Sequence, residues 1–182
     1  MSNLLSNEQR LFDEKHFDPN TGYAALDKRA QKIAHIGIHL GKITGRKLIH
    51  WADNGWERDE MRTVVVGEVL PDLCIYRTQL ATISGIEQDQ LIACAHKLKP
   101  GNLTVTKTKI HTTLVGARGA LDDFVEPLMH GASDADYSLV GQAAVMLHFS
   151  VEAAALHYGF SPEDLIELHH NRLTQLAEFK TV

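Results

Sequence analysis

Two carboxylates stand four residues apart in an otherwise apolar stretch of the sequence. Glu68 and Asp72 would project from one face of an α-helix, because four residues make slightly more than one turn. The apolar residues beside them recur at helical spacing and should face a core: Val65, Val69, Leu73, Tyr76, Leu80 and Ile83. Two acids at the edge of a buried stripe predict a partner for their charge.

A basic face lies upstream, on a second predicted helix. Steps of four, seven and eleven residues from His35 reach His39, Lys42 and Arg46, which fall within a band of roughly 60° on a helical wheel. The adjoining apolar stripe is Ile36, Leu40 and Ile43. If this helix packs beside the acidic one, the two imidazoles and the two carboxylates could converge on a divalent metal ion. The two cations could then reach phosphate oxygens.

Each of these signals has a structural alternative. The carboxylates could lie on a solvated helix edge or pair with Lys42 or Arg46. The two histidines could form a water-bonded surface pair, since the chain has eleven histidines and such spacings arise often. Trp51 and Trp56 flank a predicted turn and could stack on a nucleobase or pack on the core. The predicted substrate-binding residues are Lys42, Arg46, Trp51 and Trp56.

Every long periodic segment of the sequence is helical. Pro71 should kink a helix over residues 59–84 without ending it, because the residue four back is Gly67, which has the most room to adjust. Three glycines recur every fourth residue in another helix, which favours a close helix crossing over room for a ligand: Gly37, Gly41 and Gly45. The other predicted helices cover residues 23–53, 87–97, 114–129, 134–158 and 161–179, while 104–113 alternates like a strand or begins a further helix.

Sliding the chain along itself by 74 residues reveals an internal repeat. Eight of the 33 positions from 66 to 98 match their counterparts, where roughly two are expected by chance. The carboxylates are not repeated, since Gln142 and Met146 stand where Glu68 and Asp72 would recur. The sequence thus predicts an all-α helical bundle built from two related helix-turn-helix halves. Its parts are an N-terminal arm (1–22), a half with the site (23–101) and a scaffold half (102–182).

Composition narrows the class of protein. The chain has 182 residues, a formal net charge of −5 and no concentrated basic block, which argues against nucleic acid held through its backbone. Cys74 and Cys94 lie in helical segments and suit reduced thiols, so we expect a cytoplasmic protein. The N-terminal residues lack the apolar stretch of a signal peptide, and no later window comes near 18 uncharged apolar residues. We therefore expect no membrane span.

The acidic helix resembles part of a known family. Glu68-Val69-Leu70-Pro71-Asp72-Leu73 is similar to the Glu-x-x-x-Asp metal-binding helix of the MazG-like all-α nucleoside triphosphate pyrophosphohydrolases. The segment from Gln79 to Ile86 and the helix to Lys99 are similar to the next part of that pattern. The resemblance covers roughly residues 33–99. It implies a helical bundle that works as a dimer or higher assembly, in which acidic residues hold Mg²⁺ and water attacks between the α- and β-phosphates.

The earlier helix departs from the usual Glu-rich motif of that family, because His35 and His39 stand there. His-containing versions of this helix do occur among MazG-like sequences. Imidazole suits Mn²⁺ or Zn²⁺ better than Mg²⁺, which prefers oxygen ligands. We therefore expect Mg²⁺ or Mn²⁺, ahead of Zn²⁺, held by Glu68 and Asp72 with help from the two histidines.

The first hypothesis is a metal-dependent hydrolase that converts a nucleoside triphosphate, or a related nucleotide, to a nucleoside monophosphate and pyrophosphate. Glu68 and Asp72 would be its catalytic residues. The alternative is a nucleotide- or metal-binding helical module without catalysis, with a regulatory or assembly role. A third hypothesis is an unrelated helical-bundle metalloprotein. In each case the expected partner is a small ligand, with a homodimer possible and neither nucleic acid nor membrane involved.

Overall fold

This computed structural model describes residues 2–16, 23, 26–47, 63–98 and 107–179. Within those ranges the protein consists of helices joined by turns, and no strand occurs. The helices are α1 (Ser2–His16), α2 (Lys28–Lys42), α5 (Leu70–Ser84), α6 (Gln88–Leu98), α7 (Lys107–Met129), α8 (Tyr137–Tyr158) and α9 (Pro162–Phe179). Two π-helical turns are also present: η1 (Ile43–Lys47) follows α2, and η2 (Val65–Val69) precedes α5. The all-α expectation is confirmed.

The other helices are arranged around α8. Buried residues occupy every side of it, among them Val140, Leu147, Phe149 and Val151. Much of the rest of its buried surface is alanine, whose small side chain lets neighbouring helices approach closely. A helix that is apolar all round is stable only where other elements cover it.

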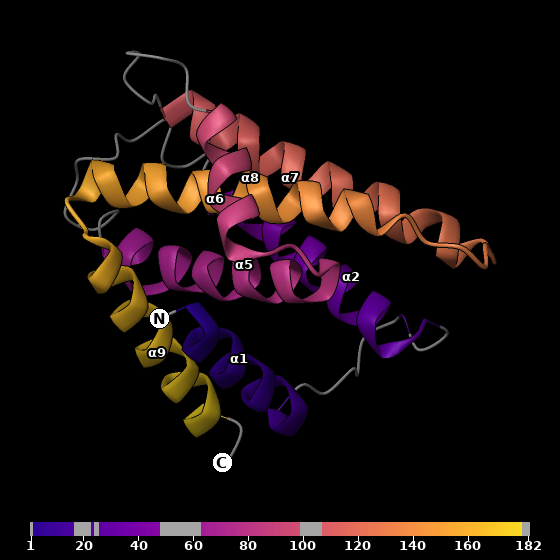
Figure 1. Ribbon diagram of the computed structural model, residues 1–182, viewed down its shortest axis with the longest axis horizontal. Helices are drawn as coiled ribbons and strands as arrows, with labels where there is room; N and C mark the ends of the chain where they lie inside the picture. The colour runs from indigo at the N-terminus through magenta and orange to yellow at the C-terminus, as the bar shows by residue number, and fades with distance from the viewer. Residues whose placement is uncertain (1, 17–22, 24–25, 48–62, 99–106, 180–182) are drawn as a thin grey trace.

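Three helices supply this cover, and a fourth packs on one of them. α5, α6 and α7 pack against α8, and α2 packs on α7 (Figure 1). On the other side of α5 lie α9 and α1, which also contact each other. The predicted N-terminal arm therefore contains a helix that is part of the bundle. Contacts also interleave the two predicted halves, because α6 packs on α8 whereas α9 packs on α5.

α8 comes closer to a membrane span than the sequence led us to expect. By length and composition it is the one described helix that could cross a bilayer, and Glu152 is its only residue of formal charge. Yet 61% of its most apolar window is buried inside the protein. A core helix meets the same criterion.

Pro71 does not end the helix, as predicted, and a single π-helical turn stands just before it. Proline has no N–H to donate to the carbonyl of Gly67, and its ring would clash with that carbonyl in a regular α-helix. In η2 the N–H of Leu70 donates to the carbonyl of Val65, five residues back, which widens the turn just before the proline. The wider turn breaks the 3.6-residue spacing between Glu68 and Asp72. Glu68 is exposed, whereas the Asp72 side chain is 18% exposed.

α7 begins earlier than the sequence predicted. Residues 107–113 are helical, so where the structure describes this segment the alternative of a further helix start is confirmed and the strand alternative is wrong. The strand preference of its threonines is weak, and it yields when the packing partner demands a helix. The buried residues Ile110, Leu114, Ala117, Leu121 and Phe124 have the 3.6-residue spacing of a helix face.

The turns after α5 and α8 have the same geometry at the predicted 74-residue offset. Gly85 and Gly159 have φ of 70° and 75°, the left-handed conformation in which glycine ends a helix at low cost. Ile86 N–H donates to the carbonyl of Ala81, and Phe160 N–H donates to that of Ala155. Both helices therefore end in a Schellman motif at equivalent positions.

The glycines of α2 serve a close helix crossing, as favoured by their spacing. A Cβ at Gly37 would lie 3.7 Å from Leu121 of α7, and one at Gly41 would lie 3.2 Å from the Arg118 guanidinium. Gly45 has no such neighbour among the described residues. The first two glycines thus face α7, and the ligand alternative has no support at these positions.

Substitutions at Gly37 should separate helix propensity from packing. Gly37→Ala is expected to raise the free energy of unfolding by about 0.5–1 kcal/mol, since its methyl group makes ordinary contacts and alanine favours a helix. Gly37→Leu is expected to lower it by about 1–3 kcal/mol through overpacking against α7. Urea denaturation checks both values. A leucine variant as stable as the alanine variant would show that α2 does not lie tightly on α7.

Candidate functional site

The two histidines of α2 form a pair on one face of the helix. The ring centroids of His35 and His39 are 4.4 Å apart, with the rings tilted by 44°. Both side chains are half-buried. The four-residue spacing places one ring a turn above the other, as the sequence predicted. α2 itself starts where Asp27 accepts hydrogen bonds from the N–H groups of its first turn, at 2.8 and 2.9 Å.

This histidine pair reaches the acidic helix through an aromatic ring. The centroid of His39 lies 5.8 Å from that of Tyr76 on α5. Tyr76 is one turn after Asp72, and burial, followed by the nearby Asp72 charge, raises the pKa of its phenol far above the usual value. The phenol therefore stays protonated and acts as a hydrogen-bond donor. The two helices thus meet where the sequence placed the histidines and Asp72.

Asp72 is paired with a cation that the sequence did not identify. Arg172 of α9 donates a hydrogen bond from Nε to Oδ1 of Asp72 at 2.8 Å. Both side chains are about four-fifths buried, with 19% of Arg172 and 18% of Asp72 exposed. The pair spans 100 residues of sequence, and Arg172 is one of several charged residues on an amphipathic helix. No local spacing could have selected it.

The remaining predicted residues are not gathered at this contact. Glu68 is exposed on η2 and Lys42 is exposed at the end of α2. Arg46 belongs to η1, and its side chain lies outside the described part of the chain. Trp51 and Trp56 also lie outside the described residues. The hypothesis that the tryptophans stack on a base therefore stays a prediction.

The described residues do not form a ready metal site. Nowhere in the described ranges do three His, Cys, Asp or Glu side chains come together closely enough to hold a metal ion. At the predicted position the two imidazoles lie against each other with tilted rings, and Asp72 is held by Arg172. The arrangement that exists is two imidazoles, a buried phenol and a carboxylate–guanidinium pair in a row. We therefore derive no reaction step through a metal, whose presence stays a prediction.

A second polar cluster lies inside the bundle. It begins at Arg77, the residue of α5 that follows Tyr76. Arg77 approaches Nδ1 of His148 on α8 at 3.3 Å. Because a guanidinium only donates, Nδ1 must accept, which leaves the ring proton on Nε2. That nitrogen lies 3.0 Å from Oε1 of Glu152. These three side chains, Arg77, His148 and Glu152, bring charge into the contact between α5 and α8.

His169 of α9 lies near this cluster without sharing in it. It is fully buried, and neither ring nitrogen has a hydrogen-bond partner among the described residues. Burial, then the positive charges of Arg77 and His170, lower its pKa from 6.5 to about 4. The imidazole is therefore neutral near pH 7, and it protonates in the folded state only under acidic conditions.

Comparison with known proteins gives no relative from which to transfer a role. No protein-family model, no curated protein and no solved structure matches the chain.

His169 should make the fold sensitive to acid. Its pKa is lower in the folded state, so as pH falls the unfolded chain takes up this proton first, near pH 6.5, and the folded chain only near pH 4. Between those values the wild type is expected to lose about 3 kcal/mol of unfolding free energy that His169→Leu does not lose. Urea denaturation from pH 7 to pH 4 measures the difference.

The matched control for this prediction is His96→Leu, since His96 is an exposed histidine on α6. That variant should keep the pH dependence of the wild type. Parallel curves for the wild type and His169→Leu would mean that His169 is hydrated or paired in solution and does not carry the lowered pKa.

Proposed function

We propose that this chain is a nucleotide pyrophosphohydrolase whose site lies where α2 meets α5. The observation that carries the proposal is the contact of His39 with Tyr76, one turn from Asp72. These residues belong to the two helices that the sequence singled out, and the acidic one resembles the Glu-x-x-x-Asp helix of MazG-like enzymes. The proposed reaction converts a nucleoside triphosphate and water to a nucleoside monophosphate and pyrophosphate.

The chain's own residues can support this hydrolysis. An imidazole of the His35 and His39 pair can accept the proton of the attacking water, since histidine is the side chain that most often acts as a general base. The protonated phenol of Tyr76 can donate to a phosphate oxygen. Arg172 can offset negative charge on the polyphosphate as the bond between its phosphates breaks. Asp72 holds the Arg172 guanidinium in place at 2.8 Å.

The repeat supports an all-α fold of the MazG type with two related halves in one chain. α5, its terminal glycine and α6 correspond at the 74-residue offset to α8, its terminal glycine and α9. The packing is reciprocal too, since the second helix of each half covers the long helix of the other. Such an exchange is what fusion of two copies of a dimer would leave behind. We propose this origin, with a cytoplasmic location and possible further dimerisation.

A second candidate is a nucleotide-binding module without catalysis. The observation that favours it is the closed pair of Asp72 with Arg172, which leaves the predicted metal ligand already occupied. In the part of the chain that the structure describes, no three-ligand group compensates for this. Such a protein would bind the polyphosphate and release it unchanged.

Pyrophosphate release separates the two candidates. We expect release from one or a few members of a panel of ribo- and deoxyribonucleoside triphosphates, run with Mg²⁺, with Mn²⁺ and without either. Asp72→Asn should lower kcat by about 100-fold or more, because the neutral amide no longer pairs with the Arg172 guanidinium and so does not hold that charge at the site. A preference for Mn²⁺ would support the predicted ligation by His35 and His39.

The control is Asp122→Asn, an exposed carboxylate on α7 that pairs with Arg118 of the same helix at 3.3 Å. It removes the same charge and should leave turnover unchanged. Circular dichroism shows whether either variant has lost the bundle. Full turnover by a folded Asp72→Asn variant would contradict the assignment, and nucleotide binding without any release would favour the second candidate.

A further inference from the structure

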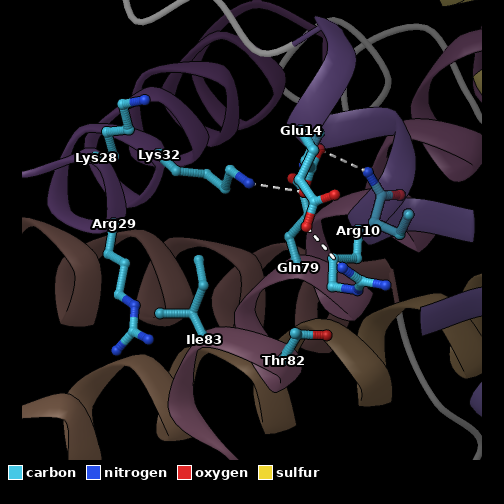
Figure 2. Close-up of a pocket in the computed structure, with 10 residues that line it drawn as sticks. Arg10, Glu14, Lys28, Arg29, Lys32, Gln79, Thr82 and Ile83 are labelled. Atoms are coloured by element: carbon cyan, nitrogen blue, oxygen red, sulfur yellow. Dashed lines mark hydrogen bonds and ion pairs between the residues drawn. The ribbon is translucent and has the colours of Figure 1, made fainter. Parts of the chain in front are cut away.

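Two clefts of the described surface differ in charge. The first lies between α1, α2 and α5 and has a volume of about 480 Å³. In it Asp13 binds the Lys32 ammonium at 2.8 Å, and Glu14 binds Arg10 at 2.7 Å (Figure 2). The Lys28 ammonium points away from this cleft (Figure 2). Because the Lys32 pair ties α1 to α2, the charge of the first cleft has a structural role.

The second cleft lies where the end of α5 and helix α6 meet the first half of α8, and it has a volume of about 610 Å³, within the range of small-molecule sites. None of the residues that line it carries a formal charge. Its half-buried lining is mainly apolar: Ile86, Tyr137, Val145 and Met146. Its exposed polar side chains are Gln90, Ser138 and Gln142. A charged ligand would find no counter-charge here, so the lining selects an uncharged one.

The charges next to this cleft are negative. Glu87, Asp89 and Asp136 are each the sequence neighbour of a lining residue, and all three are exposed. They would repel a phosphate group that extended from a bound ligand. The surroundings therefore disfavour a nucleotide and leave an uncharged molecule as the ligand that fits.

Two side chains of the lining are held in place by α7. The Tyr137 ring meets the buried Phe124 ring edge-on, with centroids 5.1 Å apart and the rings tilted by 62°. The Met146 sulfur lies 3.2 Å from the position that a Cβ at Gly116 would take. An aromatic ring and a thioether fixed in this way are preorganised for contact with a flat aromatic ligand.

Gln142 supplies polar recognition. It is four residues from both Ser138 and Met146, so the three side chains share one face of α8. Its side chain is exposed, so the amide nitrogen can donate and the amide oxygen can accept. The Gln90 oxygen already accepts from the N–H of Glu87 at 3.4 Å, which leaves its nitrogen to donate. A glutamine amide with both ends available matches the amino group and ring nitrogen N7 of adenine.

The second cleft is the counterpart of the acidic helix at the 74-residue offset. Gln142 and Met146 correspond to Glu68 and Asp72, and α6 packs on α8 as α9 packs on α5. Asp72 binds Arg172 at 2.8 Å, whereas the residues at the two corresponding positions are Met146 and Leu98. One of the two equivalent positions thus carries an ion pair and the other carries apolar residues, so they suit ligands of different charge.

From these observations we infer that the cleft between α6 and α8 binds an uncharged heteroaromatic molecule of the adenine type, as the free base or its nucleoside. Gln142 pairs with the amino edge of the ring, and Met146 packs on its face. The inference stands independently of the proposed hydrolase, because this site contains neither the histidines nor Asp72 and binds no phosphate.

Isothermal titration calorimetry in the presence of EDTA tests this site, with adenosine, inosine and AMP as probes. Adenosine should bind saturably, and inosine, which lacks the amino group, should bind about tenfold more weakly. AMP should not compete with adenosine, because its phosphate meets the surrounding carboxylates. Gln142→Leu should weaken adenosine binding about tenfold or more, and it should fold because the position is exposed.

Gln88→Leu is the matched control, since it makes the same change at an exposed position of α6 outside the lining. It should bind adenosine like the wild type. Ser138→Trp, which places a large side chain at the exposed first turn of α8, should abolish binding by filling the cleft. No binding of adenosine to the wild type, equal binding by the wild type and Gln142→Leu, or competition by AMP would overturn the inference.

Discussion

The burial of α8 on every side is the constraint on which the arrangement depends. An apolar helix of 22 residues cannot face water, so α5, α6 and α7 must cover it. α5 in turn buries apolar residues there, and three of its polar residues lie on the far side. Asp72, Tyr76 and Gln79 therefore point toward α1, α2 and α9, where each meets a polar or aromatic partner. The position of the buried core thus determines which side of α5 carries these polar contacts.

Polar residues between these outer helices are held by few but specific contacts. Asp13 joins α1 to α2 and α5, Arg172 joins α9 to α5, and His39 joins α2 to α5. Removing one partner of a largely buried ion pair leaves the other charge uncompensated, at a larger cost than the pair itself gains. The same contacts that place the candidate residues thus also fix how α1 and α9 dock on the bundle.

Periodicity predicted the helices well, because burial follows the 3.6-residue repeat directly. The stripe from Val65 to Leu80, the continuation of the helix through Pro71 and the two turn glycines were all predictable. The histidine pair was predictable for the same reason. The predicted metal cluster combined residues of two helices. The spacing of residues within one helix does not fix how that helix is rotated relative to the other. The π turn at η2 changed that rotation for Glu68, and the distant Arg172 took the place of the expected partner of Asp72.

The central claim is that a nucleotide binds where α2 meets α5, and histidine NMR tests it most directly. The ring signals of the histidines can be assigned with single His→Gln variants and followed while nucleotide is added in EDTA, which keeps metal-dependent turnover out of the measurement. The account predicts that the signals of His35 and His39 shift together and saturably, while those of His96 and His169 do not move. Saturable nucleotide binding by calorimetry with the His35 and His39 signals unchanged would place the ligand elsewhere and contradict the account.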